Sequence, residues 1–153
     1  MSNSEPYSIH LDTLFKSLEL IDVPGLVKTV TDPWYNQTLC RVNDCVVRLG
    51  VMQGQFHWHK HDAEDEFFYV IQGLWIIELE GRTVELHPGQ GFTVPRGVMH
   101  CPRAPEKTVI LMIEGAGVKP TGDNWPHQIR AGGDAQLRRR QEVPFPSWIP
   151  LAW

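Results

Sequence analysis

The sequence predicts an all-β protein, a sandwich or barrel of short antiparallel strands. From about residue 26 to residue 114, runs rich in β-branched, aromatic and aliphatic residues follow one another, and glycine or proline punctuates them. Such runs at close spacing, with turn signals between them, are typical of β-sandwiches and barrels. The chain has 153 residues, about the size of one domain.

A short amphipathic helix is predicted near the N-terminus. In SIHLDTLFKSLEL, residues 8–20, apolar side chains recur at the i, i+3, i+4, i+7 spacing of one helix face. These side chains are Leu11, Leu14, Phe15 and Leu18. VPGL at 23–26 then marks a turn. We therefore expect residues 1–39 to hold this helix and the strands that lead into the main barrel.

The barrel itself is expected within residues 40–118. Its predicted strands are CVVRLGVM at 45–52, EFFYVIQG at 66–73, LWIIELEG at 74–81, RTVEL at 82–86, FTVP at 92–95 and KTVILMIEG at 107–115. The HPGQG that follows RTVEL is a strong turn signal.

Residues 119–153 differ in character and are predicted to form an irregular C-terminal extension. Its last segment, VPFPSWIPLAW, mixes three prolines with large apolar side chains. Apolar sequence broken by proline forms neither a regular helix nor a regular strand. Soluble proteins rarely leave so much apolar surface exposed. We therefore expect this extension to pack on the barrel or on a partner subunit.

Charge and composition exclude several classes of partner. The formal net charge is -4, and the only basic run is RRR at 138–140, so we expect no nucleic acid partner. No apolar run approaches the roughly 18 residues of a membrane span. The three cysteines, an odd number, show no disulfide framework, and the N-terminal sequence has no features of a secretory signal. A cytoplasmic location is the simplest expectation.

The stretch HWHKHDAEDE, residues 57–66, carries the features of a metal site. Its histidines, His57, His59 and His61, stand on alternate residues and would share one face if a strand continues through them. Two of them could reach one ion, and a carboxylate at the start of the next strand could face the same ion. The acids are Asp62, Glu64, Asp65 and Glu66. The stretch holds more donors than one metal needs, so alternation alone leaves open which of them bind.

The spacing of these donors resembles the first motif of the cupin family. That motif runs Gly, five residues, His-x-His, three or four residues, Glu, six residues, Gly. With His59 and His61 as the pair, a gap of four residues leads to Glu66, and FFYVIQ then leads to Gly73.

A second frame through the same stretch fits less well. It uses His57, His59 and Glu64, and it places Ile71 where the motif requires glycine. In the preferred frame only the opening glycine departs, because Gly54 precedes His59 by four intervening residues instead of the five expected. The misplaced glycine affects only the turn that leads into the histidine pair, and the metal donors keep their expected spacing.

The second cupin motif runs Gly, five residues, Pro-x-Gly, two residues, His, three residues, Asn. Here Gly89 is followed by QGFTV, then by Pro95 and Gly97 around one residue, and after VM by His100. Ala104 stands in place of the terminal asparagine. That asparagine is not a metal ligand in the family, so the departure does not weaken the site.

With both motifs present in the family's order, the chain is identified as a member of the cupin family. The resemblance implies a jelly-roll antiparallel β-barrel, often a homodimer, with one divalent metal per chain held by His59, His61, Glu66 and His100. Imidazoles and a carboxylate suit Fe(II), Mn(II), Ni(II) or Zn(II), and we favour Mn(II) or Fe(II). Four protein ligands on an octahedral ion leave two positions open, as in catalytic metal sites.

The resemblance also implies a metal-dependent enzyme with a small-molecule substrate. We expect dioxygenase- or decarboxylase-like chemistry on a small organic acid or phenol. A sugar isomerase or a lyase is the alternative among enzymes, and a non-catalytic metal- or ligand-binding module is the alternative outside them. The fold does not separate these reactions. No segment before residue 40 suits a DNA-binding domain, which disfavours a transcription regulator, and the intact ligand set disfavours a storage role.

Two further residues are candidates for this site. His57 stands two residues before His59 and so would lie on the same face as the ligand pair. It could contact a metal-binding side chain or act as an acid or base on the substrate. Its alternative role is that of a histidine at the barrel rim. Arg48 lies within an apolar strand. If it faces the cavity it could bind a substrate carboxylate with two nitrogens, and if it faces outward it would extend into solvent.

Overall fold

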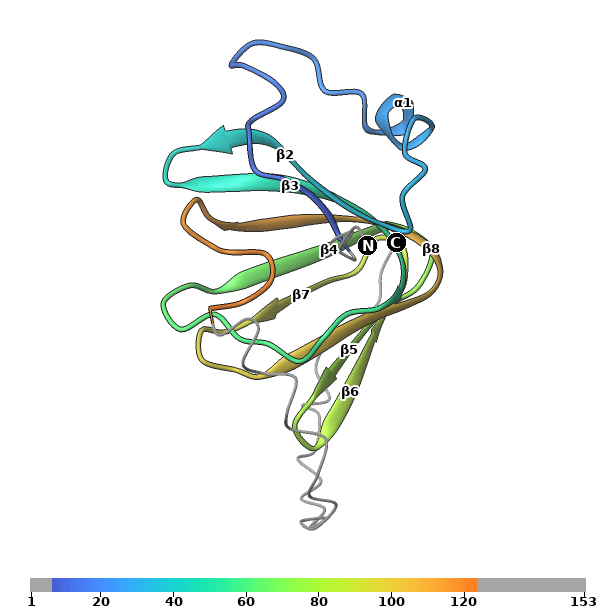
Figure 1. The fold of residues 1–153 in the computed structure, drawn as a ribbon, viewed down its shortest axis with the longest axis vertical. Helices are drawn as coiled ribbons and strands as arrows, with labels where there is room; N and C mark the ends of the chain where they lie inside the picture. The colour runs from blue at the N-terminus through green and yellow to red at the C-terminus, as the bar shows by residue number, and fades with distance from the viewer. Residues whose placement is uncertain (1–6, 124–153) are drawn as a thin grey trace, which may run out of the picture.

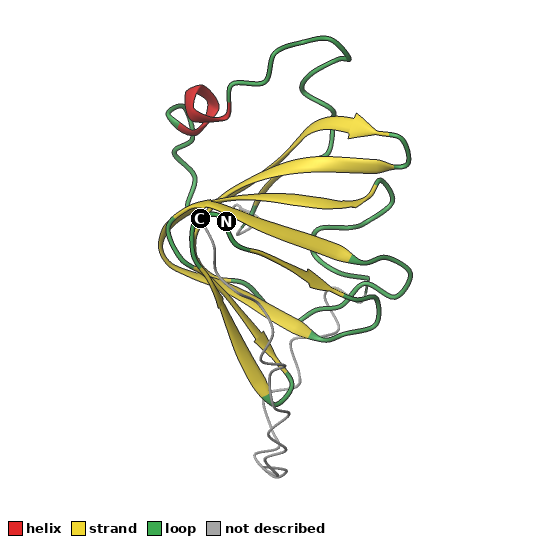
Figure 2. Ribbon diagram, turned by 180° about the vertical axis from the view of Figure 1, so that it is seen from behind, coloured by secondary structure: helices red, strands yellow, loops and turns green. Residues whose placement is uncertain are grey.

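Strands dominate the computed structural model, which describes residues 7–123 (Figures 1 and 2). The strands are β1 (Ser8–His10), β2 (Trp34–Val42), β3 (Cys45–Gln55), β4 (Glu66–Gln72), β5 (Trp75–Leu79), β6 (Arg82–Leu86), β7 (Gly91–Val94) and β8 (His100–Gly115). The one helix within the described residues, α1, spans Val23–Val27. The predicted all-β fold is confirmed. No helix in this described part is long and apolar enough to cross a membrane.

The long strand β8 joins the two halves of the barrel. Its C-terminal part pairs with β3 on one side and with β4 on the other, and its first residues, from His100 to Arg103, pair with β5. β4 continues to β7, and β5 continues to β6. These pairs are antiparallel, and only the short contact of β1 with β2 is parallel among the described strands. One curled sheet therefore wraps around an interior, as Figure 1 shows.

Apolar side chains fill both faces of the sheet near β3. Inside the barrel, aromatic and sulfur-containing side chains form the main core, among them Trp34, Met52, Phe56, Phe68 and Trp75. A second cluster lies on the outer face, where Leu39, Leu49, Val51 and Val109 are covered by the N-terminal segment and α1. Because β3 is covered on both faces, its continuous apolar run fits a central strand better than an edge strand.

The predicted helix at residues 8–20 is wrong. That segment forms β1 and then an irregular arm whose backbone bonds to the edge of β2, from Leu14 N to Thr38 O at 3.0 Å and from Phe15 N to Leu39 O at 2.9 Å. An open strand edge offers a row of unpaired backbone groups, whereas a short isolated helix is marginal in water. Tertiary pairing therefore overrides the helical apolar spacing.

The only described helix begins instead where a turn was expected. Asp22 caps α1, since its side chain accepts a hydrogen bond from Gly25 N at 3.1 Å. Pro24 stands in the first turn, where its missing N–H costs nothing. The cap and the proline are therefore the local signals that set this short helix.

The six strands predicted between residues 45 and 115 are all present, although β8 begins earlier than expected, at His100. β2 was not singled out from the sequence, and because it starts at Trp34 the sheet extends to both sides of the predicted boundary after residue 39. The C-terminal extension was predicted to pack on the barrel or on a partner. Beyond residue 123 it lies outside the described residues.

Two glycines allow a direct test of the turns. Gly73 and Gly81 have positive φ angles, +87° and +82°. A Cβ at Gly73 would lie 2.8 Å from the Cα of Thr108 and 2.9 Å from the carbonyl oxygen of Lys107, whereas a Cβ at Gly81 would meet nothing within 4 Å. We expect Gly81→Ala to cost about 1 kcal/mol of unfolding free energy through backbone strain alone, and Gly73→Ala to cost at least about 3 kcal/mol. Urea unfolding curves measure both, and equal losses would contradict the described packing of the β4–β5 turn.

Candidate metal centre

Four buried side chains bring their donor atoms together inside the barrel. His59 and His61 lie in the segment after β3, Glu66 is the first residue of β4, and His100 is the first residue of β8. One donor atom from each lies within 4.8 Å of the others, and all four residues are buried. The structure thus gathers the set that the motif spacing implied, and it could hold a metal ion.

Backbone pairing fixes the two most distant members of this set. His59 and His100 form an isolated antiparallel bridge, in which each N–H donates to the other's carbonyl oxygen at 2.9 Å. His61 is held in a similar way, since its carbonyl oxygen accepts from Gly97 N at 2.7 Å. The three alternate histidines would share one face only if a strand continued through them, and β3 ends before them, at Gln55. The rings of His59 and His100 therefore come together through their isolated backbone bridge and not through a regular strand.

Backbone carbonyls also set which ring nitrogen of each histidine faces the centre. His59 Nδ1 lies 3.0 Å from the carbonyl oxygen of His57, and His100 Nδ1 lies 2.9 Å from that of Val98. A carbonyl accepts only, so Nδ1 must carry the proton and donate it. Nε2 is then left with its lone pair, which is the tautomer that a metal requires.

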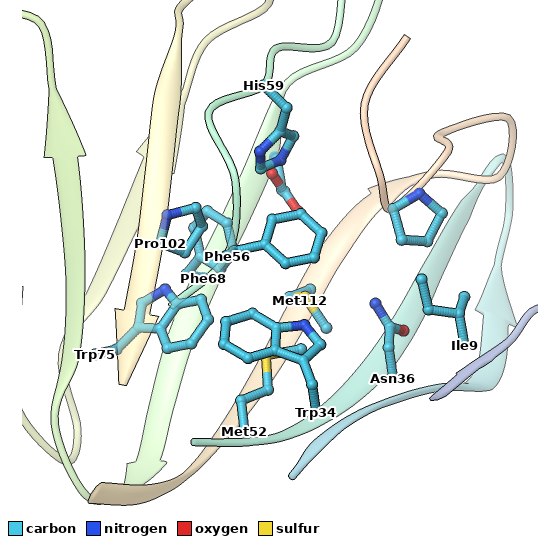
Figure 3. A pocket seen from close by; sticks show the side chains of 12 residues that line it. Ile9, Trp34, Asn36, Met52, Phe56, His59, Phe68, Trp75, Pro102 and Met112 are labelled. Atoms are coloured by element: carbon cyan, nitrogen blue, oxygen red, sulfur yellow. The ribbon is translucent and has the colours of Figure 1, made fainter. Parts of the chain in front are cut away.

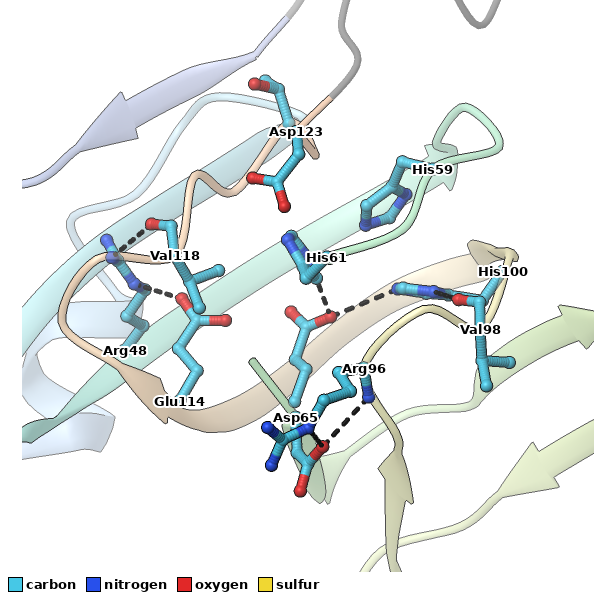
Figure 4. Close-up of polar contacts among 12 residues, drawn as sticks. Arg48, His59, His61, Asp65, Arg96, Val98, His100, Glu114, Val118 and Asp123 are labelled. Atoms are coloured by element: carbon cyan, nitrogen blue, oxygen red, sulfur yellow. Dashed lines mark hydrogen bonds and ion pairs between the residues drawn. The ribbon is translucent and has the colours of Figure 1, made fainter. Parts of the chain in front are cut away.

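The Glu66 carboxylate stands between two imidazoles, those of His61 and His100, which Figure 4 labels. Its Oε2 lies 3.2 Å from His100 Nε2 and 3.4 Å from His61 Nε2. Neighbouring ligand atoms in an octahedral complex with bonds of about 2.1 Å are roughly 3 Å apart. In the described part of the chain, neither nitrogen of the buried His61 ring has a hydrogen-bond partner. A bound divalent cation would give one of these nitrogens a partner, so the residues present fit a metal.

Burial keeps the His59 ring neutral. The pKa of His59 is lowered to about 3, chiefly by burial, with His100 adding to the shift and Glu66 opposing it. Burial alone would raise the pKa of Glu66, but the adjacent His100 and His61 rings outweigh it and hold this pKa well below its usual range. At neutral pH the site therefore offers a neutral imidazole and an ionised carboxylate, the forms that bind metal.

Arg48 points inward from β3 and meets a protein carboxylate. Its Nε lies 2.5 Å from Glu114 Oε1, its Nη1 donates to Thr38 Oγ1 at 2.8 Å, and its Nη2 donates to Val118 O at 3.3 Å. Glu114 occupies the place expected for a substrate carboxylate. The substrate-binding role of Arg48 therefore stays a prediction.

Glu114 is a buried charge that was not predicted from the sequence. It stands directly opposite Glu66 in the pairing of β4 with β8. Burial raises the pKa of Glu114 well above its ordinary value, the Glu66 carboxylate raises it further, and Arg48 opposes both. Its position in the mostly apolar run KTVILMIEG was the available signal, because a buried acid is rare unless it is paired.

His57 lies beside the donor set and contacts both ends of the described chain. Its Nδ1 is 3.2 Å from the hydroxyl oxygen of Tyr7, and its Nε2 is 2.7 Å from the carbonyl oxygen of Thr121. Burial lowers the pKa of His57. The next residue along, Gly122, packs on His59 so closely that a Cβ would lie 2.6 Å from the Cβ of His59. His57 thus fastens the segment that covers one side of the centre.

The remaining acids of HWHKHDAEDE lie on the surface, as expected for a solvated turn. Asp62 pairs with Lys60 at 2.6 Å, and Asp65 accepts from Arg96 N at 2.9 Å. Glu64 is also exposed. Of the four acids, only Glu66 is buried and faces the histidines.

A pocket opens from the donor set into the aromatic core (Figure 3). His59 and Glu66 form part of its wall, and the rest of the lining is mainly aromatic and aliphatic. The metal donors therefore face a mostly apolar space, which is the general character of small-molecule sites.

Comparisons with known proteins agree with this geometry. The family model of the cupin domain matches residues 45–114. The chain is 32% identical over 91 residues to the protein YdbB of Bacillus subtilis, covering 59% of this chain and 80% of that protein. A cupin-2 domain protein from Shewanella frigidimarina has a similar solved structure, with 29% identity, a TM-score of 0.60, and coverage of 63% of this chain and 94% of that one.

A structural relative at lower identity shows the same fold. The protein NMB1881 from Neisseria meningitidis has a TM-score of 0.57 at 20% identity, covering 63% of this chain and 99% of that one.

Removing a donor should abolish metal binding without unfolding the barrel. We expect His59→Ala and His100→Ala each to weaken divalent metal binding by more than the roughly 10–100-fold that loss of an outer partner costs. His57→Ala should stay within that smaller range. Calorimetric titration with Mn(II) measures the affinities, circular dichroism checks the fold, and His87→Ala, which alters an exposed ring, is the control. Equal losses for His57→Ala and His59→Ala would show that the preferred frame is wrong.

The metal-free protein should lose stability in mild acid. The pKa of His59 falls from 6.5 in the unfolded chain to about 3 in the fold. Its contribution is therefore fully present above pH 6.5 and declines toward pH 3, because only the unfolded state takes up the proton. We expect the unfolding free energy to fall by on the order of 1 kcal/mol per pH unit below pH 6.5. Urea unfolding between pH 7 and pH 4.5 tests this, and an unchanged slope in His59→Gln would contradict it.

Proposed function

The chain belongs to the cupin family, and from that premise we propose that it is a metal-dependent enzyme with dioxygenase- or decarboxylase-like chemistry. Its substrate would be a small organic acid or phenol. The observation that carries the proposal is the buried set of three imidazoles and one carboxylate beside a mostly apolar pocket. The unpartnered ring of His61 supports a ligand role for this set.

We propose that His59, His61, Glu66 and His100 hold one divalent cation, with Mn(II) or Fe(II) favoured over Ni(II) or Zn(II). When bound, such a cation supplies Lewis acidity or a site for O₂ activation. Borderline nitrogen donors with a single hard carboxylate suit any of these ions. The preference among them is part of the proposal.

The chain's own residues would position the substrate and exclude water. His59 and Glu66 line the pocket, so a substrate oxygen entering it comes close to two of the four donors. The segment around Thr121 and Gly122 covers the neighbouring side through the contact of His57 with Thr121. We propose that His57 orients this cover, since its ring already bonds to Tyr7 and Thr121. Its role as a proton carrier stays a prediction.

The buried Arg48–Glu114 pair would hold the carboxylate of Glu66 in place for the metal. Glu114 lies opposite Glu66 across the sheet, and Arg48 holds Glu114 from the other side. A buried acid beside a second carboxylate is costly unless a cation or a shared proton compensates it. Arg48 supplies part of that compensation, so these two residues would fix the position of Glu66 without touching the metal.

A homodimer and a cytoplasmic location also stay predictions. Sugar isomerase and lyase reactions on the same donors, and non-catalytic binding, are the alternatives to the proposed chemistry.

Metal content and turnover together test the proposed function. We expect freshly purified protein to contain about one Mn or Fe per chain, and the loaded protein to consume O₂ or release CO₂ with at least one member of a panel of small acids and phenols. His61→Ala should abolish both the metal and the turnover, whereas the exposed His87→Ala should keep both. A full complement of metal with no reaction across the panel would favour a binding module instead.

A further inference from the structure

The pocket beside the donor set has an aromatic body and few polar groups. Trp34 and Phe56 stack with ring centres 5.1 Å apart and planes 12° from parallel, and the Trp34 and Trp75 rings lie 5.9 Å apart. The complete lining is Ile9, Trp34, Asn36, Met52, Phe56, His59, Glu66, Phe68, Trp75, Pro102, Met112 and Pro120. Apart from the two metal donors, Asn36 carries the only side-chain amide or acid in this lining.

Asn36 presents an unpaired polar atom to this space. The residue is 4% exposed, and its Oδ1 has no hydrogen-bond partner within residues 7–123. Figure 3 shows its amide pointing into the pocket between Trp34 and Ile9. The indole N–H of Trp75 is likewise buried and without a partner in this part of the chain. Buried polar groups are nearly always satisfied, and an unsatisfied one costs stability, so the amide fits a ligand that supplies the missing hydrogen bond.

The same lining disfavours a sugar as the occupant. A sugar acid carries several hydroxyl groups, and each would lose its water on entering an apolar pocket with very few polar partners. An aromatic ring loses little hydration and gains ring–ring contact with Trp34 and Phe56. The pocket therefore selects for a ring with polar groups at its ends.

The size of the pocket limits what can enter. The space between these side chains is about 330 Å³ out to the open mouth, but its interior offers only about 20 Å³, room for about one water. Two of the lining side chains are Met52 and Met112. Methionine is unbranched and flexible, so a ring can enter by displacing the ends of these side chains. Only a small, single-ring ligand fits this limit.

We propose that the pocket binds a small aromatic acid or phenol, with an oxygen toward the metal donors and a hydrogen donor that meets Asn36. This assignment deepens the proposed function and rests on it, because one end of the ligand is anchored at the metal. Asn36 is then the residue that selects ligands with a second polar group on the ring.

Binding to the full-length protein loaded with Co(II) tests the ligand class. The probes are benzoate, 3-hydroxybenzoate, 4-hydroxybenzoate and gluconate, followed by calorimetry and by the Co(II) absorption spectrum. We expect benzoate to bind at least about 10-fold more tightly than gluconate. One hydroxybenzoate should bind a further 2–10-fold more tightly than benzoate, roughly the range of one neutral hydrogen bond. Each binding event should change the Co(II) spectrum.

Asn36→Leu separates a ligand-binding role from a structural one. It should bring the affinities for benzoate and the preferred hydroxybenzoate to within about 2-fold of each other, while the melting temperature without ligand stays the same or rises. If the leucine of Asn36→Leu disturbs the fold, Asn36→Ala serves in its place and should give the same loss of selectivity. Gln53→Leu, which replaces an exposed amide on β3, is the matched control and should keep the selectivity of the unaltered protein.

The outcomes distinguish this inference from the proposed function. Failure to load Co(II) would overturn the metal site and with it the proposed function. Loaded protein that binds gluconate as tightly as benzoate would overturn the aromatic ligand class and leave the metal site standing. Selectivity that survives both Asn36 substitutions would overturn the role of Asn36.

Discussion

The paired backbone hydrogen bonds between His59 and His100 are the constraint on which the rest of the site depends. They join residues from opposite ends of the barrel sequence and place the two rings side by side, with centres 4.1 Å apart. The same two rings donate from Nδ1 to nearby carbonyl groups, so their other nitrogens face inward. Glu66 and His61 then complete the set from the start of β4 and the turn before it. Backbone hydrogen bonds thus help to bring together four buried groups that could hold a metal ion.

Burying charged groups such as the Glu66 carboxylate costs free energy. Contacts with several neighbouring polar side chains offset this cost. Glu66 lies close to His100 and His61, and Glu114 stands opposite it with Arg48 beyond. Charges removed from water are costly unless each has a partner. Within the described residues, this chain of contacts runs from the interior through Arg48 to Thr38 and Val118. Strands β2, β3, β4 and β8 are therefore coupled through polar contacts as well as through the core.

Much of the fold and of the donor set could be predicted from the sequence. The strands between residues 45 and 115 carry strong local signals, and the motif spacing singled out Glu66 among four nearby acids. The N-terminal arm could not be predicted, because its apolar spacing fits a helix and only pairing with the edge of β2 decides against it. β2 itself was hidden by two buried polar residues, Asn36 and Thr38, and the side-chain partner of Thr38, Arg48, lies on β3.

Non-local contacts also concealed the residues that support the site. Glu114 is opposite Glu66 only through the register of β4 with β8. His57 contacts the carbonyl oxygen of Thr121, a residue 64 positions away in the sequence, so its role depends on a distant partner. Single-sequence patterns describe local periodicity, so side chains whose role depends on a distant partner leave no comparable signal. The spacing of the two cupin motifs made distant partners predictable only for the four donors.

X-ray absorption spectroscopy of the protein loaded with Mn(II) or Fe(II) tests the central claim most directly. The account predicts a first coordination shell of nitrogen and oxygen atoms alone, at about 2.0–2.2 Å, with the outer-shell scattering of three imidazole rings. A sulfur ligand, or scattering from fewer than three imidazoles, would contradict a centre built from His59, His61, Glu66 and His100.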